Sequence, residues 1–307
     1  MEMICIACPG QGSQAPGFME PWLEIPVFRR SIEESAKAID LDLIHFGTVA
    51  DAETIRDTKI AQPLIVAAGI ASFETLKDKL GDSMAIAATA GHSVGEITAA
   101  YVSGIFDSQT ALEFVQRRGN EMADAAGLSA SSMAAVVGGE LDQVLAHLDS
   151  AGLFAANYNG AGQVVAAGSK DAIASLVASP PAGSRVVALQ VAGAFHTSFM
   201  EPARPALKEF ATKLHVSDPK ISIWSNSDGQ LVGSGQKFLD LMVNQVSNPV
   251  RWDKTMDSMT SANVSLMIEL LPGGALSGIA KRAMPNTVAI ALKTPADLDK
   301  VAEAIGK

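Results

Sequence analysis

Cysteine is scarce in this sequence. It occurs only twice in 307 residues, at Cys5 and Cys8. A structural zinc site takes about four ligands, and the chain offers no second Cys pair to complete one, so we expect no metal site. A redox Cys-x-x-Cys pair should open a helix, whereas Pro9-Gly10 follows this one. Both thiols lie in an apolar run, 3–8, and we expect them to be buried structural side chains of a first strand.

Basic residues and long apolar runs are also in short supply. Lys and Arg number 23 against 33 Asp and Glu, a net charge of −10, and no basic run is present, which argues against nucleic-acid binding. No uninterrupted apolar stretch reaches the ~18 residues that a membrane span needs. Met1-Glu2-Met3 lacks the basic segment of a signal peptide. We therefore expect a cytoplasmic protein of one large domain or two domains, without a membrane segment, and a monomer.

Residues 85–104 have the pattern of a strand, a tight turn and a helix. A small apolar run is followed by Gly91-His92-Ser93-Val94-Gly95, then by helical spacing that ends at Gly104. This is the G-x-S-x-G nucleophile elbow, in which the glycines let strand and helix approach closely. We predict that Ser93 is a nucleophile and that the free N–H of Val94 binds an oxyanion. The alternative is a glycine-rich turn with an incidental serine.

A glycine-rich loop, Pro9-Gly10-Gln11-Gly12-Ser13-Gln14-Ala15, follows the first strand. It imitates the dinucleotide fingerprint G-x-G-x-x-A, but Pro16, Gly17 and Pro21 forbid the regular helix that this site needs. The better interpretation is a loop at the carboxyl end of a strand, where the sites of α/β sheets lie. Gln11 would offer a main-chain donor there.

Arg118 lies in the middle of the apolar face of a helix predicted from Ser108 to about Gly127. The apolar residues within about 60° of it are Ala111, Phe114, Val115, Met122 and Ala125. A buried guanidinium needs an anion, because an unpaired buried charge is costly. Two interpretations stay open: a structural pair, for instance with Glu121, or a ligand carboxylate held by two parallel hydrogen bonds. Arg117, by contrast, has the surroundings of a surface residue.

From Ser132 the pattern changes to short strands and helices. The expected order is strand 133–138, helix 141–150, strands 153–157 and 163–167, helix 170–178 and strand 185–191. This βαββαβ order is that of the ferredoxin-like unit, and it predicts a small domain inserted into a larger one. In the larger part we expect strands at 221–225 and 264–271, and a long helix over 58–80 with Gln62-Pro63 at its start.

The chain has five histidines, and His196 is the best candidate base. His147 lies in the first helix of the expected small domain, and His45 and His215 have no evident partner. His92 adjoins Ser93, but neighbouring side chains at a turn diverge. His196 lies in a glycine-flanked loop at the junction of the two domains, where clefts form. We predict that it activates Ser93, and the alternative is a structural histidine.

Five short motifs occur one after another along the chain. They are Pro9-Gly10-Gln11-Gly12-Ser13-Gln14, Gly91-His92-Ser93-Val94-Gly95-Glu96, Arg118-Gly119, Gly193-Ala194-Phe195-His196 and Asn248-Pro249-Val250-Arg251-Trp252. Over nearly the whole chain they resemble the malonyl-CoA:acyl carrier protein transacylases of type II fatty acid synthesis and the acyltransferase domains of polyketide synthases. One departure is Leu271-Pro272-Gly273-Gly274, where relatives often carry Gly-Pro-Gly-Lys; it leaves local detail of the cleft open.

The resemblance implies a role for each of these residues. Ser93 would carry the acyl group, with His196 as its base. Gln11 and Val94 would supply the oxyanion N–H groups, and Arg118 would bind the free carboxylate of malonyl.

Two supporting residues are implied as well. The main-chain carbonyl of Gln245 would orient the histidine, so that no catalytic aspartate is required, and Gln62 would be the second supporting residue. The form Ala194-Phe195-His196, with a small residue after Ser93, goes with malonyl rather than methylmalonyl in this family.

The implied fold is α/β. We expect a large α/β-hydrolase-like domain with a parallel sheet, formed by residues 1–129 and 193–307. Residues 130–192 would form the inserted ferredoxin-like domain.

The implied reaction moves malonyl from malonyl-CoA to the phosphopantetheine thiol of acyl carrier protein through a malonyl-serine, with no permanently bound cofactor. One alternative is an α/β-hydrolase-type esterase or thioesterase, which needs an acid between Ser93 and His196; Asp124, Asp142 and Asp171 lie there, but none follows a predicted strand of the large domain. Another is a non-catalytic acyl-CoA-binding protein.

The carrier is expected to be acidic, whereas this chain itself carries a net charge of −10. Docking would then need a local basic surface. Lys281, Arg282, Arg251 and Lys254 are the candidates.

Overall fold

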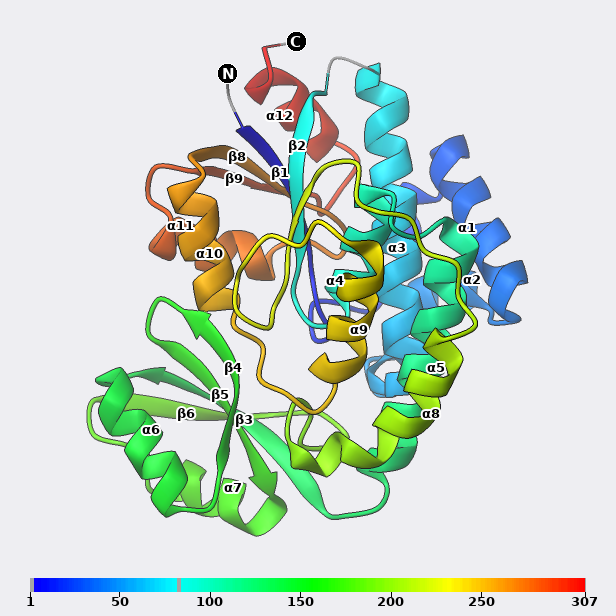
Figure 1. The fold of residues 1–307 in the computed structure, drawn as a ribbon. Coiled ribbons are helices and arrows are strands. Elements are labelled where there is room, and N and C mark those ends of the chain that lie inside the picture. The colour runs from blue at the N-terminus through cyan, green and yellow to red at the C-terminus, as the bar shows by residue number, and fades with distance from the viewer. Residues whose placement is uncertain (1–2, 82–83, 307) are drawn as a thin grey trace.

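The computed structural model describes residues 3–81 and 84–306, and a parallel five-stranded sheet lies at its centre (Figure 1). Its strands are β1 (Met3–Cys8), β2 (Ile86–Gly91), β7 (Ser222–Trp224), β8 (Val264–Glu269) and β9 (Val288–Ala291). They lie in the order β7-β2-β1-β8-β9, and every neighbouring pair is parallel. The carboxyl ends of the strands therefore meet at one edge, where α/β proteins form their sites.

Helices cover both faces of this sheet (Figure 1). The helices of this larger part are α1 (Pro26–Ile39), α2 (Leu43–Thr48), α3 (Thr58–Leu80), α4 (Gly95–Ser103), α5 (Ser108–Ala126), α8 (Arg204–Ala211), α9 (Gly235–Gln245), α10 (Trp252–Ser261), α11 (Ala275–Ala283) and α12 (Asp297–Ala304), with 3-10 turns η1 (Glu20–Trp22), η2 (Thr54–Arg56) and η4 (Ser198–Ala203).

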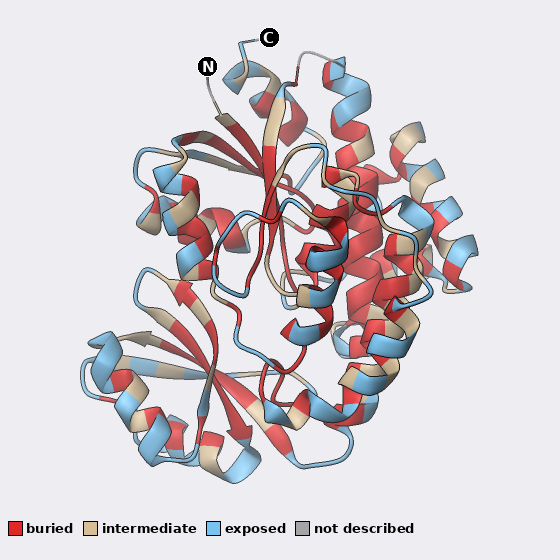
Figure 2. Ribbon diagram, viewed as in Figure 1, coloured by how far each residue is buried: buried red, intermediate tan, exposed pale blue. Residues whose placement is uncertain are grey.

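The central strand β1 is buried on both faces, as its apolar sequence predicts (Figure 2). Ile4, Ile6 and Cys8 belong to the core under α3, α4 and α5. Cys5, on the opposite face, packs in the core under α10 and α11. Both thiols are free, and burial raises their pKa, so the prediction of structural cysteines is confirmed.

Helix α3 begins one turn earlier than Gln62-Pro63. Asp57 caps it by accepting a hydrogen bond from the N–H of Lys59 (2.8 Å), and Pro63 lies inside the helix. The predicted range of 58–80 is confirmed, but the helix begins directly after the capping carboxylate of Asp57 and not at the proline. The point at which α3 begins matters for the site, because it places Gln62 on a buried turn that faces α5.

A second, antiparallel sheet forms a small subdomain at the lower left of Figure 1. Its elements are β3 (Ser131–Gly138), α6 (Leu141–Ser150), β4 (Phe154–Gly160), β5 (Gln163–Ser169), α7 (Lys170–Ala178) and β6 (Ser184–Leu189). The strand order β4-β5-β3-β6 is that of a ferredoxin-like unit, and the subdomain has a core of its own. The predicted α/β fold class with a small inserted unit is thus confirmed, while the domain limits at 130 and 192 stay our proposal.

The small subdomain contacts the larger part of the chain through its edge strand β4. Asn157 forms a parallel bridge with Val250, and the N–H of Tyr158 donates to the carbonyl of Val250 (2.8 Å). The guanidinium of Arg251 lies 4.4 Å from the ring centre of Tyr158. These contacts hold the subdomain beside the segment that follows α9.

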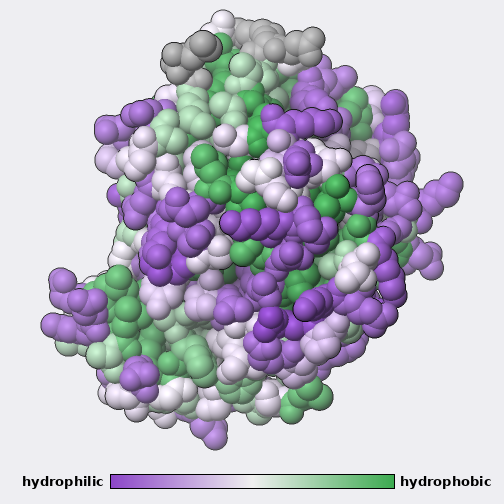
Figure 3. Space-filling view, viewed as in Figure 1, coloured by the Kyte–Doolittle hydropathy of each residue, from purple (hydrophilic) through white to green (hydrophobic). Residues whose placement is uncertain are grey.

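Hydrophilic side chains cover much of the face drawn in Figure 3, with hydrophobic patches between them, one over the small subdomain. Within the described residues, no helix combines the length and the apolarity needed to cross a membrane. Met1 and Glu2, which entered the prediction about a signal peptide, lie outside the described residues.

Candidate functional site

The predicted elbow forms at the carboxyl end of β2. Ser93 has φ of 55°, a left-handed conformation that a non-glycine residue adopts only under constraint. A Cβ on Gly91 would lie 2.0 Å from the carbonyl carbon of Gly95, and a Cβ on Gly95 would lie 2.1 Å from the carbonyl oxygen of Cys8. The two glycines are thus required by the close approach of β1, β2 and α4, as the sequence pattern predicts.

His196 lies against the hydroxyl of Ser93. The His196 Nε2 and Ser93 Oγ are 2.7 Å apart, and the Nδ1 of His196 is 2.8 Å from the main-chain carbonyl of Gln245. Because that carbonyl can only accept, Nδ1 carries the proton and Nε2 is free to accept the proton of Ser93. The pair comes from segments 103 residues apart, β2–α4 and the loop before η4.

The environment keeps His196 neutral. Its side chain is 4% exposed, and burial followed by the positive charge of Arg118 lowers its pKa to about 3. A neutral imidazole is the form that accepts a proton. His92 does not compete, because its Nε2 lies 2.9 Å from Oδ1 of Asn159 rather than against Ser93.

Arg118 lies beside the same hydroxyl. It is 1% exposed, its Nη2 donates to Ser93 Oγ at 3.4 Å, and its other partners are the amide oxygens of Gln62 (2.7 Å) and Gln245 (2.9 Å). Glu121 pairs with Arg117 instead (2.9 Å), so the structural pair that the sequence left open is not formed. Over residues 3–81 and 84–306, Arg118 has no ion pair.

The guanidinium is therefore a buried cation held by neutral oxygens. Burial lowers the pKa of Arg118 to about 10, partly opposed by the charge of Glu96, so it remains charged at neutral pH. An unpaired buried cation next to a nucleophile favours a ligand with a carboxylate at that place.

Val94 and Gln11 both lie at the elbow. Val94 is the residue before α4, and the loop carrying Gln11 packs against the turn, since a Cβ on neighbouring Gly10 would come within 2.7 Å of the carbonyl oxygen of His92. In the part of the chain that the structure describes, neither main-chain N–H donates to a protein acceptor. Free N–H groups beside a nucleophile are suited to an oxyanion.

Two residues that the sequence did not single out complete the surroundings. Asn226, just past β7, accepts from the N–H of Ser93 (2.7 Å) and donates to the carbonyl of Gly91 (2.7 Å). Glu96, on α4, accepts from the N–H of Asn226 (2.6 Å) and from Nε2 of Gln245 (2.6 Å). A polar residue directly after a strand was an available signal for Asn226, and Glu96 stood unassigned within the elbow motif.

A cavity of about 410 Å³ opens next to His196, between the small subdomain and η4. Its walls include Leu148, Phe154, Tyr158, Thr197 and Ser198. An extended ligand arm lying here would end at the Ser93–His196 pair.

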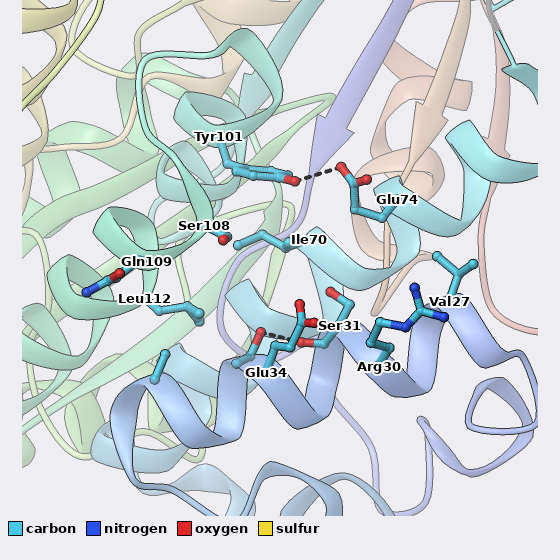
Figure 4. A pocket seen from close by; sticks show the side chains of 12 residues that line it. Val27, Arg30, Ser31, Glu34, Ile70, Glu74, Tyr101, Ser108, Gln109 and Leu112 are labelled. Carbon is cyan, nitrogen blue, oxygen red and sulfur yellow. Dashed lines mark hydrogen bonds between the residues drawn. The ribbon is translucent and has the colours of Figure 1, made fainter.

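A second cavity, of about 420 Å³, lies between α1, α3, α4 and α5 (Figure 4). It is lined by Arg30, Glu34, Glu74, Tyr101, Gln109 and Leu112, among others, and the Tyr101 hydroxyl donates to Glu74 (2.6 Å). Its lining includes neither Ser93, His196 nor Arg118. Among the described residues, no group of three His, Cys, Asp or Glu is placed to hold a metal ion.

Comparison with known proteins gives a consistent picture. A family model described as "Acyl transferase domain" matches residues 6–299. The malonyl CoA-acyl carrier protein transacylase of Mycobacterium tuberculosis (strain H37Rv) is 43% identical over 300 residues, covering 98% of this chain and 99% of that protein.

Solved structures are similar over the same length. The crystal structure of MCAT from Mycobacterium tuberculosis has a TM-score of 0.93 at 42% identity, covering 98% of this chain and 100% of that one. A structure of a type II PKS acyl-carrier protein in complex with its malonyl-transacylase has a TM-score of 0.92 at 27% identity, covering 99% and 100%.

Proposed function

Because the chain belongs to the acyl transferase domain family, we propose that it is the enzyme that transfers malonyl from malonyl-CoA to acyl carrier protein. The observation that carries this function is the position of Ser93 Oγ, 2.7 Å from the base His196 and 3.4 Å from the buried cation Arg118. The first contact makes a nucleophile, and the second selects an acyl group that ends in a carboxylate.

The first half-reaction loads the enzyme. His196 Nε2 takes the proton of Ser93, and the serine oxygen attacks the thioester carbonyl of malonyl-CoA. The N–H groups of Val94 and Gln11 hold the resulting oxyanion; loss of one such donor costs about 3 kcal/mol of transition-state stabilisation. His196 returns the proton to the departing CoA sulfur, and malonyl stays on Ser93 as an ester.

The second half-reaction reverses these roles. The phosphopantetheine thiol of the carrier gives its proton to His196 and attacks the ester carbonyl, and Ser93 leaves with the proton. The cavity between the small subdomain and η4 offers the approach for the extended pantetheine arm.

Arg118 provides the selection. The malonyl carboxylate completes the hydrogen bonding of a guanidinium that otherwise faces neutral amides. An acetyl group would leave that buried charge unpaired, at a cost of several kcal/mol.

The partners follow from the reaction. Malonyl-CoA and the phosphopantetheinylated carrier are the substrates, and no bound cofactor takes part in the steps above. A monomer in the cytoplasm remains our expectation. For the carrier, Lys281 and Arg282 on α11 and Lys254 on α10 are exposed and form the proposed basic docking surface. Arg251 is the weakest candidate, because it is paired with Asp253 (2.7 Å) and stacked on Tyr158.

The hydrolase alternative has less support. An α/β-hydrolase orients its histidine with a carboxylate, whereas Nδ1 of His196 faces the main-chain carbonyl of Gln245. The two functions separate in one assay with malonyl-CoA and either the holo carrier or the apo carrier without its phosphopantetheine arm. We expect malonyl on the holo carrier alone. Equal release of free malonate with both carriers would mean a hydrolase.

A further inference from the structure

Glu96 is a carboxyl group that the reaction steps above do not use. It lies on the first turn of α4, three residues after Ser93, and is 1% exposed. Oε1 accepts a hydrogen bond from the N–H of Asn226 and Oε2 accepts one from Nε2 of Gln245, both at 2.6 Å. A buried carboxyl group with two short hydrogen bonds has a fixed position, and so have the groups that donate to it.

The amide of Gln245 has only one orientation that satisfies its neighbours. Its Nε2 faces three acceptors: Glu96 Oε2, the carbonyl oxygen of Ser93 (3.2 Å) and Oδ1 of Asn226 (3.2 Å). Its Oε1 accepts from Nη2 of Arg118 (2.9 Å). A flipped amide would direct its NH2 group at a guanidinium, which has donors only.

We propose that Glu96 is a positioning residue for acyl-group selection: by fixing the amide of Gln245, it holds the guanidinium of Arg118 beside Ser93. The inference rests on the proposed function, because it concerns how the enzyme recognises malonyl. Glu96 makes no hydrogen bond to Ser93 Oγ or His196, and its hydrogen-bonded connection to the guanidinium runs through Gln245.

The orientation of the Gln245 amide requires only an acceptor at Oε2 of Glu96 and not a charge. Burial raises the pKa of the Glu96 carboxyl to about 8. The hydrogen bond from the Asn226 N–H and the positive charge of Arg118, the charged group that faces this carboxyl, lower the pKa in part. A carboxyl oxygen keeps a lone pair in both protonation states, so both positions can accept throughout. A carboxamide differs, because its nitrogen cannot accept.

The test is Glu96→Gln, which keeps the shape and places an NH2 group against one of the two donors. The amide of Gln245 then loses its preferred orientation, and with it Arg118 loses an acceptor. We expect kcat/KM for Ser93 loading to fall about tenfold or more with malonyl-CoA and much less with acetyl-CoA. Glu74→Gln is the matched control, since Glu74 pairs with Tyr101 away from the site; both rates should be unchanged.

A double variant separates positioning from general damage. If Glu96 acts through Arg118, then Glu96→Gln should not change the malonyl-to-acetyl ratio further when Arg118→Ala is present. The inference would be overturned if Glu96→Gln lowered the loading rates with malonyl-CoA and acetyl-CoA equally. It would also be overturned if Glu96→Gln lowered the malonyl-to-acetyl ratio as much in the Arg118→Ala background as in the wild type. A wild-type enzyme that fails to load malonyl at all would instead overturn the proposed function.

Gln245→Ala covers the case in which Glu96→Gln does not fold. This variant removes the amide but keeps the main-chain carbonyl that orients His196. The malonyl-to-acetyl ratio should fall while Ser93 still reacts with a fluorophosphonate probe. An unchanged ratio in this variant would contradict the inference independently.

Discussion

At the scale of single residues, one hydroxyl is shared by two side chains with different tasks. His196 approaches Ser93 Oγ from one segment and Arg118 from another, and both are buried. The same burial that lowers the pKa of His196 keeps Arg118 in need of an anion. In the proposed function, reactivity and selectivity therefore have a common physical cause, which is the exclusion of water from the surroundings of Ser93.

Replacement of Arg118 tests the selection. In Arg118→Ala we expect malonyl loading to fall by about 2–4 kcal/mol, roughly 30- to 1,000-fold, because a buried charge pair loses one partner. Acetyl loading should fall little or rise. Rates of acyl-enzyme formation with the two thioesters provide the measurement, and Arg117→Ala on the same helix serves as the control. A variant with the wild-type preference would make Arg118 merely structural.

The pH dependence tests the state of His196. Its pKa of about 3 means that the imidazole stays neutral far below the ordinary value of 6.5. We expect kcat/KM for Ser93 acylation to stay level between about pH 7 and pH 5, and to fall only when the imidazole gains a proton at lower pH. Stability should decline earlier, as the pH falls from about 6.5 to about 3, because over that range the unfolded chain binds a proton at His196 that the folded chain does not. An acid limb centred near pH 6.5 would contradict this.

At the scale of elements, the site depends on three backbones in close contact. The end of β1, the end of β2 and the start of α4 meet where side chains are absent, at Gly91 and Gly95. Asn226, at the end of β7, binds across the turn between them. The left-handed conformation of Ser93 is held by this contact and not by its own preference.

Gly95→Ala tests this contact. Its Cβ would collide with the carbonyl of Cys8, and we expect a loss of about 2–3 kcal/mol in the free energy of unfolding. Gly278→Ala is the control, since it lies in α11 with no atom near its added Cβ and should stabilise the protein by about 0.5–1 kcal/mol. The free energy of unfolding of the two variants is measured by denaturant unfolding. A Gly95→Ala variant as stable as the wild type would contradict the close backbone contact at the elbow.

The sequence predicts the side chains proposed to carry out the reaction better than it predicts the residues that hold them in position. Ser93 is identified by its glycines, and Arg118 by helical phase, because both signals are local. Asn226 and Glu96 meet across 130 residues, and no local pattern records such a contact. The range 58–80 of α3, by contrast, follows from a local helical pattern and agrees with the structure.

At the scale of the whole molecule, the small subdomain, η4 and the segment after α9 enclose the cavity that opens next to His196. The bridge between Asn157 and Val250 fixes one edge of this cleft, and His92 reaches Asn159 across it. In the proposed function, this chain with its net charge of −10 receives an acidic carrier at a locally basic surface.

Charge reversal of Lys281 and Arg282 tests the proposed basic docking surface. We expect the doubly substituted Glu variant to raise KM for the carrier by roughly fivefold, about 1 kcal/mol, because two favourable charges become repulsive. Loading from malonyl-CoA should be unaffected. Lys170→Glu, on the small subdomain, is the control. An unchanged carrier KM would remove α11 from the docking surface.

The most direct measurement of the central claim is the intact mass of the enzyme after mixing with malonyl-CoA, with and without Ser93. The account predicts that the wild-type chain gains the mass of one malonyl group, loses it when holo carrier is added, and that Ser93→Ala gains nothing. A malonyl adduct on Ser93→Ala would contradict the account, and so would a wild-type chain that never carries the group.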